Sequence, residues 1–354
     1  MAKNKKPVNK NRLFQVLFLL FYKVKTSISE KYRHPLICSF KITKNCNLRC
    51  THCPFWRQPA VPVPGNETPE NLRIGTLPEN TCRPAGNSFE QHNTIPADRL
   101  PAVYENLSFA RIRALLEKLK NDGVKIIIFE GGEPLLWMDG SRKKGISDVI
   151  EYAKRLFFIT GITTNGTLNL NRINPDIFFV SIDGLEKTHN RLRGRSFGKI
   201  IENITSARNK KIIANICISK ENKDEIPDLV KFLNNKVFGT TVQFFYPYEG
   251  LPDLALSAEE KTGVINRLLE LKRQGYKILN SASSLVKMKN NSWKCHDFLV
   301  ANVESDGSFS CGCYLKNKIK EISCSDCGFA VHCEISLAYM LNWQSINAAK
   351  NIFW

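Results

Sequence analysis

The chain of 354 residues is 43% hydrophobic and 24% charged, which is typical of a globular protein with one large domain and an appendage. This composition excludes disorder throughout the chain. The longest apolar run, Leu13 to Tyr22, is ten residues and contains Gln15, whereas a helix that spans a membrane needs about 20. We therefore do not expect an integral membrane protein.

The 51 Lys and Arg residues outnumber the 33 Asp and Glu residues, which gives a net charge of +18. Residues 1–49 hold twelve of the basic residues and one acid, Glu30, and carry +11. A basic stretch of this kind can meet RNA, an anionic membrane surface or an acidic partner, or it can simply keep the protein soluble. The charge alone does not distinguish among these four roles.

Residues 3–26 predict a basic amphipathic helix, which could lie in a membrane surface or pack its apolar side against the rest of the chain. Lys23 and Lys25 follow the apolar run at once, without the small-residue cleavage site of a secretory signal. We therefore expect a cytoplasmic protein, with peripheral membrane contact as an open alternative. The apolar residues at three- and four-residue spacing are Leu13, Val16, Leu17, Leu20 and Phe21.

From Pro35 onward, short β-branched or aromatic runs alternate with amphipathic stretches, the pattern of parallel strands joined by helices. The predicted strands are 36–42, 125–130, 157–163, 177–182, 212–219 and 241–246. The predicted helices are 109–122, 146–155, 197–209, 224–234 and 257–274. This order predicts an α/β fold, a partial parallel (β/α)6 barrel similar to a TIM barrel, with its active site at the carboxyl ends of the strands.

Three parts are expected: an N-terminal helix over 1–34, the partial barrel over 35–280, and a small cysteine-rich domain over 281–354. Within the barrel, residues 54–107 hold nine of the sixteen prolines and little periodicity, which indicates an irregular insertion, either a lid or a flexible excursion.

The first predicted strand leads into Cys46, Cys50 and Cys53, spaced CxxxCxxC in a loop. Three cysteines at this spacing can hold a cubane iron-sulfur cluster and leave its fourth iron without a protein ligand. A structural zinc site would need a fourth ligand nearby, and only His52 lies within the loop. The spacing therefore favours a cluster with an open coordination position, which catalysis needs.

From about residue 36 to 250 the chain resembles the radical S-adenosylmethionine enzymes. In that superfamily the CxxxCxxC loop holds a [4Fe-4S] cluster whose free iron binds S-adenosylmethionine, and Cys46, Cys50 and Cys53 match its ligands. The residue before the last cysteine is usually aromatic in the family, and here it is His52.

Further segments at predicted strand ends resemble parts of the same family. One is the GGEP motif, where backbone groups and the acidic side chain meet the ammonium of the methionine moiety. The others resemble segments that line the cofactor and substrate cavity, with Ser181 and Asp183 as hydroxyl or ribose contacts and Arg193 as a residue that positions the cofactor. Asn215 and Ser219 in the fifth strand are further candidates. The resemblance thus implies cofactor contacts at Gly131, Gly132, Glu133, Pro134, Thr164, Asn165, Ser181, Asp183 and Arg193.

Six more cysteines form a second group near the C-terminus, and they resemble the SPASM and shorter twitch extensions that hold auxiliary [4Fe-4S] clusters. The family continues with two further cysteines, which are absent here; Leu337 occupies the first of those places. We therefore expect one auxiliary cluster, with zinc as the alternative, and either Cys311 or Cys313 as a ligand. The remaining cysteines, Cys38, Cys82 and Cys217, are interpreted as inert thiols. The candidate ligands are Cys295, Cys311, Cys313, Cys324, Cys327 and Cys333.

The resemblance implies an oxidoreductase-type radical enzyme that cleaves S-adenosylmethionine reductively, gives a 5′-deoxyadenosyl radical and abstracts hydrogen from a substrate. It also implies a reducing partner such as ferredoxin or flavodoxin. The SPASM-like tail favours a peptide or protein substrate, and the basic, apolar N-terminus suggests a lipid, isoprenoid or other small molecule at a membrane surface. Net charge suggests RNA, but no RNA-binding module pattern is present, and we do not expect a nucleic-acid partner. A non-catalytic metal-cluster scaffold is the remaining alternative.

Overall fold

The computed structural model describes residues 12–55 and 105–354, except 142, 209, 317 and 320, and side chains from Phe18 onward apart from Leu19. The predicted insertion at 54–107 lies almost wholly outside the described residues, as do Cys82 and the lysines before α1 (Arg12–Ile28). No helix in the described part of the chain is long and apolar enough to cross a membrane.

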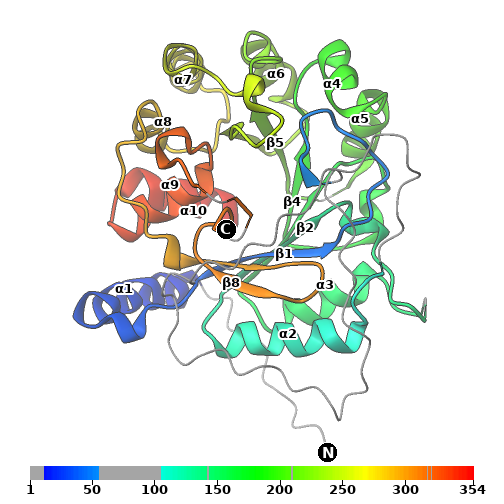
Figure 1. Cartoon of the computed structure of the whole chain (residues 1–354), viewed down its shortest axis with the longest axis vertical. Helices are drawn as coiled ribbons and strands as arrows, with labels where there is room; N and C mark the ends of the chain where they lie inside the picture. Colours follow the sequence, from blue (N-terminus) through cyan, green and yellow to red (C-terminus); the bar gives the residue numbers. More distant parts are fainter. Residues whose placement is uncertain (1–11, 56–104, 142, 209, 317, 320) are drawn as a thin grey trace, which may run out of the picture.

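One eight-stranded sheet organises the described residues, in the order β6-β5-β4-β3-β2-β1-β7-β8. All neighbouring strands are parallel except β7 and β8, which are antiparallel. The sheet is curved and open, and helices surround its outer face (Figure 1). The strands are β1 (Ile37–Thr43), β2 (Ile126–Gly131), β3 (Ile159–Thr164), β4 (Ile177–Ser181), β5 (Ile212–Ile218), β6 (Gly239–Phe244), β7 (Val300–Val303) and β8 (Phe309–Cys311).

The helices confirm the predicted β/α alternation, since α-helices follow β2, β4, β5 and β6, while only a 3-10 helix (Leu170–Arg172) lies between β3 and β4. They are α2 (Phe109–Asn121), α3 (Ile146–Lys154), α4 (Glu186–Arg193), α5 (Phe197–Ser206), α6 (Ile226–Leu233), α7 (Ala258–Arg273), α8 (Ala282–Met288), α9 (Ala330–Tyr339) and α10 (Trp343–Phe353). The partial parallel barrel expected from the sequence is therefore confirmed. Its neighbours β7 and β8 were not predicted.

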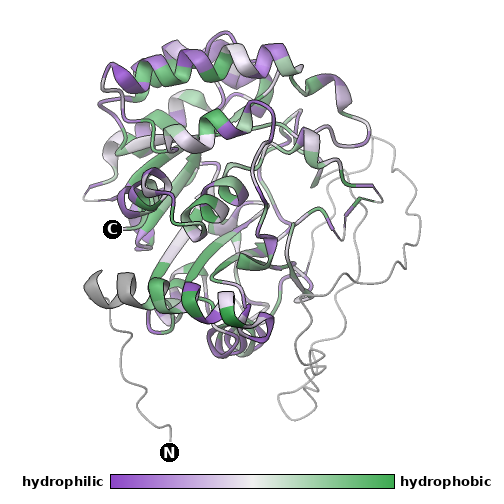
Figure 2. Cartoon of the chain, turned by 90° about the vertical axis from the view of Figure 1, so that its left-hand side faces the viewer, coloured by the Kyte–Doolittle hydropathy of each residue, from purple (hydrophilic) through white to green (hydrophobic). Residues whose placement is uncertain are grey.

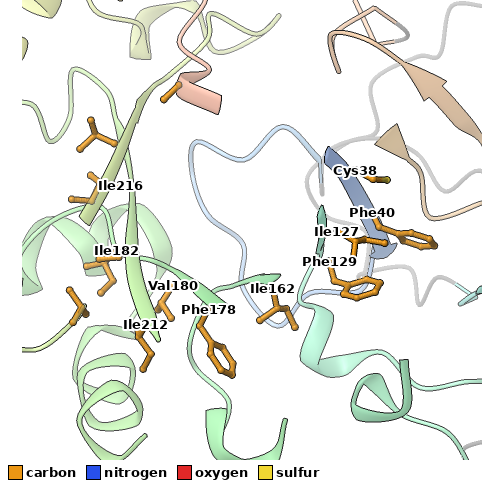
Figure 3. Close-up of a cluster of buried hydrophobic side chains, with 14 of the residues drawn as sticks. Cys38, Phe40, Ile127, Phe129, Ile162, Phe178, Val180, Ile182, Ile212 and Ile216 are labelled. Atoms are coloured by element: carbon orange, nitrogen blue, oxygen red, sulfur yellow. The ribbon is translucent and has the colours of Figure 1, made fainter. Parts of the chain in front are cut away.

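Alternation along the strands divides the sheet into two faces. Side chains such as Phe40, Phe129 and Phe178 point outward and are fully buried against the helices, in one continuous core (Figure 3). Figure 2 shows the matching pattern on the helices, with apolar and polar residues alternating along each of them. Burial of this size, at about 25 cal/mol per Å² of apolar surface, is the main source of stability.

The amino-terminal end of the barrel is closed by apolar side chains. Ile159, Ile177 and Ile213 begin their strands and form a second cluster, against which Ile352 and Phe353 of α10 pack. The carboxyl ends of β1 to β5, at the opposite end of the barrel, carry its candidate site residues.

The segment after residue 280 is continuous with the barrel. Its strand β7 pairs with β1 along Ile37 to Phe40, and Ala301 and Val303 lie in the same core as the barrel strands. Gly328 makes a second connection: its carbonyl accepts a hydrogen bond from the Phe244 N–H at 2.9 Å, at the end of β6. The cysteine-rich residues are thereby placed beside the carboxyl ends of the strands.

Candidate active site

The loop after β1 holds the three predicted cluster ligands. Cys50 is buried, whereas Cys46 and Cys53 are half-buried, and the Cys53 N–H donates to the Cys50 carbonyl at 3.2 Å. The Thr51 N–H donates to the carbonyl of Leu192 at 2.8 Å and so fixes the loop to α4. The chain therefore brings three thiols together in one anchored loop.

These thiols lie close enough for their charges to influence one another. Burial raises the pKa of the Cys50 thiol to about 11; the Arg193 charge opposes this rise, and Cys53 and Cys46 add to it. Burial likewise raises the pKa of Cys46, with a contribution from Cys53. Thiolates in such a place need a positive partner, because burial disfavours their charge. An iron-sulfur cluster supplies that positive charge, so this donor set fits one.

No three His, Cys, Asp or Glu residues within the described ranges are grouped closely enough to hold a single metal ion. A single zinc ion needs ligand atoms within about 2.3 Å of one point, while a cubane spreads its iron atoms over a larger volume.

Gly131 and Gly132 allow the end of β2 to approach this loop closely. A Cβ atom at Gly131, whose φ is +124°, would lie 2.4 Å from the Thr43 carbonyl oxygen, and one at Gly132 would lie 2.3 Å from that of Asn45. The Gly132 and Glu133 N–H groups donate to the same two carbonyls, at 2.7 and 2.8 Å. The glycines thus set the position of the cysteine loop and do more than form a turn.

Glu133 is fully buried and joins the ends of β2 and β3. Its carboxylate accepts hydrogen bonds from the Thr164 hydroxyl at 2.7 Å, the Asn165 N–H at 2.8 Å and the Leu135 N–H at 3.1 Å. Burial raises the pKa of Glu133, while these three bonds oppose the rise. The carboxylate is therefore occupied within the protein, and the contact with the cofactor's ammonium that the resemblance implies stays a prediction. Pro134, also buried, begins a short 3-10 helix after Glu133 (Pro134–Leu136).

Asn165 extends this contact to the cysteine loop. Its side-chain amide donates to the Asn47 side-chain oxygen at 2.8 Å and lies 4.0 Å from the Cys46 sulfur. Asn47 in turn donates to the Thr167 hydroxyl at 2.8 Å. The predicted site residues of β2 and β3 thus converge on the cysteine loop.

A buried ion pair holds the other side of the loop. Asp183 is fully buried and pairs with the Arg193 guanidinium, and the His52 Nε2 lies 3.2 Å from the same carboxylate. The Arg193 guanidinium also lies 3.9 Å from the Cys50 sulfur. Burial alone would raise the pKa of Asp183, but the Arg193 charge and the His52 hydrogen bond outweigh it and hold the pKa well below its usual range. Asp183 therefore positions His52 and Arg193 around the cluster loop.

The remaining candidates lie nearby in β4 and β5. Ser181 is buried at the end of β4 and pairs in register with Asn215, whose side-chain oxygen accepts from the Thr241 hydroxyl at 3.2 Å. Ser219 is buried, and its N–H donates to the Asn222 side chain at 2.8 Å. All nine candidate cofactor contacts therefore lie at the carboxyl ends of β2, β3 and β4 or on α4.

Two features of this site were not found from the sequence. Arg193 ends the helix α4, which was not among the predicted helices, and His52 pairs with Asp183 across a large sequence separation. Asn222 is a further member, since its amide donates to the Asp183 carbonyl at 2.7 Å. The departure at position 52 from an aromatic residue was the one sequence signal that pointed to this network.

Several of the C-terminal cysteines lie close enough for their charges to influence one another. Burial raises the pKa of Cys295 to about 12, and Cys327, Cys313 and Cys324 contribute to the rise. Burial raises the pKa of Cys327 to about 11, again with contributions from Cys313 and Cys324. The structure therefore groups Cys295, Cys313, Cys324 and Cys327.

The thiols of the other two C-terminal cysteines, Cys333 and Cys311, each contact a backbone carbonyl. Cys333 is buried and donates to the Ser284 carbonyl at 3.8 Å. Burial raises its pKa, and the neighbouring Glu334 adds more to the rise than the thiols of Cys327 and Cys295 do. Cys311 lies in β8 and donates to the Phe298 carbonyl at 3.7 Å. Which of Cys311 and Cys313 is a ligand stays a prediction, and the contribution of Cys313 to the raised pKa values of Cys295 and Cys327 favours Cys313.

Comparison with known proteins identifies the class. The family model described as the radical SAM superfamily matches residues 40–233, more than half of the chain, so the chain belongs to the radical S-adenosylmethionine superfamily. Membership implies a [4Fe-4S] cluster and S-adenosylmethionine.

Individual relatives are distant. The chain is 26% identical to Fe-coproporphyrin III synthase of Methanosarcina barkeri over 69% of its own length and 53% of that protein's. It is 25% identical to the sporulation killing factor maturation protein SkfB of Bacillus subtilis over 64% of its own length and 47% of that protein's. The chain spans about half the length of these curated relatives.

Among solved structures, SuiB of Streptococcus suis bound to the precursor peptide SuiA matches 94% of this chain and 72% of that one, with a TM-score of 0.55 and 16% identity. SuiB bound to S-adenosylmethionine matches with a TM-score of 0.56. At this identity the likeness shows the fold, a radical SAM partial barrel with a cysteine-rich extension.

Proposed function

We propose that this enzyme binds its [4Fe-4S] cluster through Cys46, Cys50 and Cys53, and that it abstracts hydrogen from a peptide or protein substrate. The observation that carries the first half is the convergence of three thiols in one loop with the glycine edge of β2 and the Asp183–Arg193 pair. When bound, the cluster and S-adenosylmethionine would supply an electron and a 5′-deoxyadenosyl radical.

The chain's own residues would position these groups and exclude water. Arg193 places a positive charge 3.9 Å from the Cys50 sulfur, and hydrogen bonds to cluster sulfurs are one of the factors that set a reduction potential. The backbone at Gly132 and Thr164 lies at the carboxyl ends of neighbouring strands, where the cofactor can be reached. The apolar closure around Ile352 and Phe353 shuts the opposite end of the barrel against solvent.

An anaerobic assay tests the cluster assignment. The reconstituted and reduced wild type should form 5′-deoxyadenosine from S-adenosylmethionine, and a variant with Ala at Cys46, Cys50 and Cys53 should form none. Cys217→Ala, which removes a thiol in β5 outside the ligand set, is the matched control and should retain the product. Formation of 5′-deoxyadenosine by the triple variant would refute the assignment.

A peptide substrate is favoured by two relatives. SkfB is named for maturation of the sporulation killing factor, and SuiB has been solved with a precursor peptide. The cysteine group on the extension next to β6 supports the same proposal, together with one auxiliary cluster on Cys295, Cys313, Cys324 and Cys327 and a reducing partner such as ferredoxin or flavodoxin. The non-catalytic scaffold does not agree with membership of an enzyme superfamily.

A small-molecule substrate is the second candidate, because one relative is named for synthesis of Fe-coproporphyrin III. The two candidates differ in which cell fraction donates hydrogen. Extract from source cells grown in deuterated medium would be divided into a peptide fraction and an organic-solvent fraction. Deuterium in 5′-deoxyadenosine from the peptide fraction, lost after protease treatment, would support the peptide. Transfer from the solvent fraction alone would refute it.

A further inference from the structure

An apolar surface on α1 is unexplained by the chemistry of the barrel. One side of this helix packs inward: Tyr22 is buried and donates to the His34 carbonyl at 2.6 Å, and the Thr26 hydroxyl lies 2.9 Å from that of Tyr339. The opposite side exposes Leu20, Phe21, Val24 and Ile28, the last with 76% of its surface accessible. Among the described side chains of α1, these four apolar residues are therefore not used in packing against the barrel.

A second group of exposed apolar side chains adjoins this side. Met340, Leu341 and Trp343 connect α9 to α10, and Trp343 is 76% exposed. Lys23 joins the two groups, because its ammonium lies 3.8 Å from the centre of the Tyr339 ring and 4.0 Å from the Met340 sulfur. We call the seven apolar residues the α1 patch: Leu20, Phe21, Val24, Ile28, Met340, Leu341 and Trp343.

Positive charge surrounds the α1 patch. The Lys25 ammonium lies 4.5 Å from the centre of the Phe21 ring, and that of Lys31 lies 5.1 Å from the centre of the Tyr32 ring. The sequence offers little to neutralise them, since residues 1–49 contain the single acid Glu30 and residues 335–354 contain none. An apolar surface with a basic border fits an occupant that is both apolar and anionic.

We propose that the α1 patch docks the enzyme on the surface of an anionic phospholipid bilayer. A helix with Leu and Phe on one side and lysines beside them lies in the plane of a membrane interface, where Trp and Tyr are also enriched. The lysine stems can extend past the apolar side chains and bring their ammonium groups to the phosphates. A second copy of the chain fits less well, because it would set Lys23, Lys25 and Lys31 against their own counterparts.

The position of the patch determines the orientation on the membrane. The ring of Phe18 in α1 packs edge-on against that of Phe158, with 5.9 Å between the ring centres, and the Lys125 ammonium lies 4.9 Å from the centre of the Phe18 ring. Phe158 and Lys125 immediately precede β3 and β2, so α1 lies at the amino-terminal end of the barrel, on the side that faces the viewer in Figure 2. The bilayer would therefore lie opposite the cysteine loop, and the site would open away from it.

Vesicle cosedimentation of the full chain tests this proposal. We expect binding to vesicles of phosphatidylcholine with about 30% phosphatidylglycerol, little binding to phosphatidylcholine alone, and release when salt rises from about 0.1 to 0.5 M. Replacing Leu20, Val24 and Ile28 by Gln should lower the partition coefficient about tenfold per inserted side chain. Met138→Gln, which changes an exposed side chain near the other end of the barrel, should leave it unchanged.

Two double variants test how much the lysine charges contribute to vesicle binding. Lys25→Gln with Lys31→Gln should weaken binding about 30-fold, at about fivefold per lysine. Lys199→Gln with Lys231→Gln removes equal charge from α5 and α6 and should have no effect. Circular dichroism would confirm that each variant is folded. The proposal would be overturned if the wild type bound neither vesicle type or bound both equally. It would also be overturned if the wild type were a dimer and the variant with Gln at Leu20, Val24 and Ile28 were the only one to become a monomer, because the α1 patch would then contact a second copy of the chain.

Discussion

Buried charge around the cysteine loop is the main constraint at the level of single residues. Asp183 and Arg193 are paired away from water, and His52 shares the carboxylate. A buried ion pair of this kind contributes little net stability, but the loss of one partner leaves an uncompensated charge. We therefore interpret the pair as fixing the position of the Arg193 side chain beside Cys50.

Asp183→Asn should destabilise the protein by about 3–5 kcal/mol, because Arg193 would stay buried without its counter-charge. The pKa of Asp183 is lowered, so the contribution of the ion pair is present above the ordinary Asp pKa and is lost only as pH falls through the lower value. The difference in unfolding free energy should thus be constant from about pH 5 to 9 in urea titrations. Asp228→Asn, an exposed and paired control, should change stability by less than about 1 kcal/mol. Similar losses in the two variants would contradict this interpretation.

Gly132→Ala should displace the cysteine loop, because the new methyl group would lie 2.3 Å from the Asn45 carbonyl oxygen. We expect a loss of about 1–3 kcal/mol and poor retention of iron after anaerobic reconstitution. Gly140→Ala is the matched control, since a Cβ atom there would meet nothing within 4 Å. Normal iron content in the Gly132 variant would show that the close approach is unimportant.

The C-terminal thiols give a prediction that separates two neighbours. Starting from the variant without Cys46, Cys50 and Cys53, we expect about four iron and four sulfide per chain from the auxiliary cluster. Cys313→Ser in that background should remove them, whereas Cys311→Ser should not, because Cys311 points to the Phe298 carbonyl. Equimolar zinc would support the alternative metal, and the reverse pattern would refute the assignment of Cys313.

At the level of elements, the contact of the extension with β6 depends on one glycine. A Cβ atom at Gly328 would lie 1.9 Å from the Phe244 carbonyl oxygen, and Lys261 of α7 donates to the Cys327 carbonyl at 3.1 Å from the other side. The segment with Cys324 and Cys327 is thus held between β6 and α7.

Gly328→Ala should move this segment away from β6 and lower the auxiliary metal content, while the first cluster and cleavage of S-adenosylmethionine are retained. Metal analysis of the variant beside Gly263→Ala checks this. Gly263 lies in α7 with nothing near its Cβ position, so Ala there should stabilise the helix by about 0.5–1 kcal/mol. Unchanged metal in the Gly328 variant would contradict the proposed role of this contact.

The sequence predicted the six barrel strands to within about two residues, because β-branched runs between amphipathic helices carry a strong local signal. It missed β7, which is only four residues long, and α4, whose sequence EKTHNRLR is polar with only His189 and Leu192 buried. It found the cysteine loop from its spacing and the GGEP segment from its resemblance to the family. It could not find the His52–Asp183 contact, because a contact between two side chains that are far apart in the sequence leaves no periodic pattern.

For the whole molecule, the barrel and the region after residue 280 share one core, while Tyr22 of α1 packs in a separate cluster with Leu36, Phe298 and Leu299. Residues 300–303 complete the sheet beside β1, and Ile352 with Phe353 closes the barrel. We propose that residues 35–354 unfold as one unit, although 281–354 form a distinct cysteine-rich region. Scanning calorimetry of the metal-loaded protein should show a single transition. A separate early transition, with the barrel intact afterwards, would show that residues 281–354 fold independently.

The position of β1 between β2 and β7 also affects how the protein acquires its structure during synthesis. The strand that leads into the cysteine loop is synthesised long before its partner Val300–Val303. Pairing between such distant segments is slow, and until it occurs the edge of β1 and its apolar neighbours are exposed. Insertion of the cluster into a growing chain would therefore precede completion of the sheet, and chaperones would have to protect that edge in the interval.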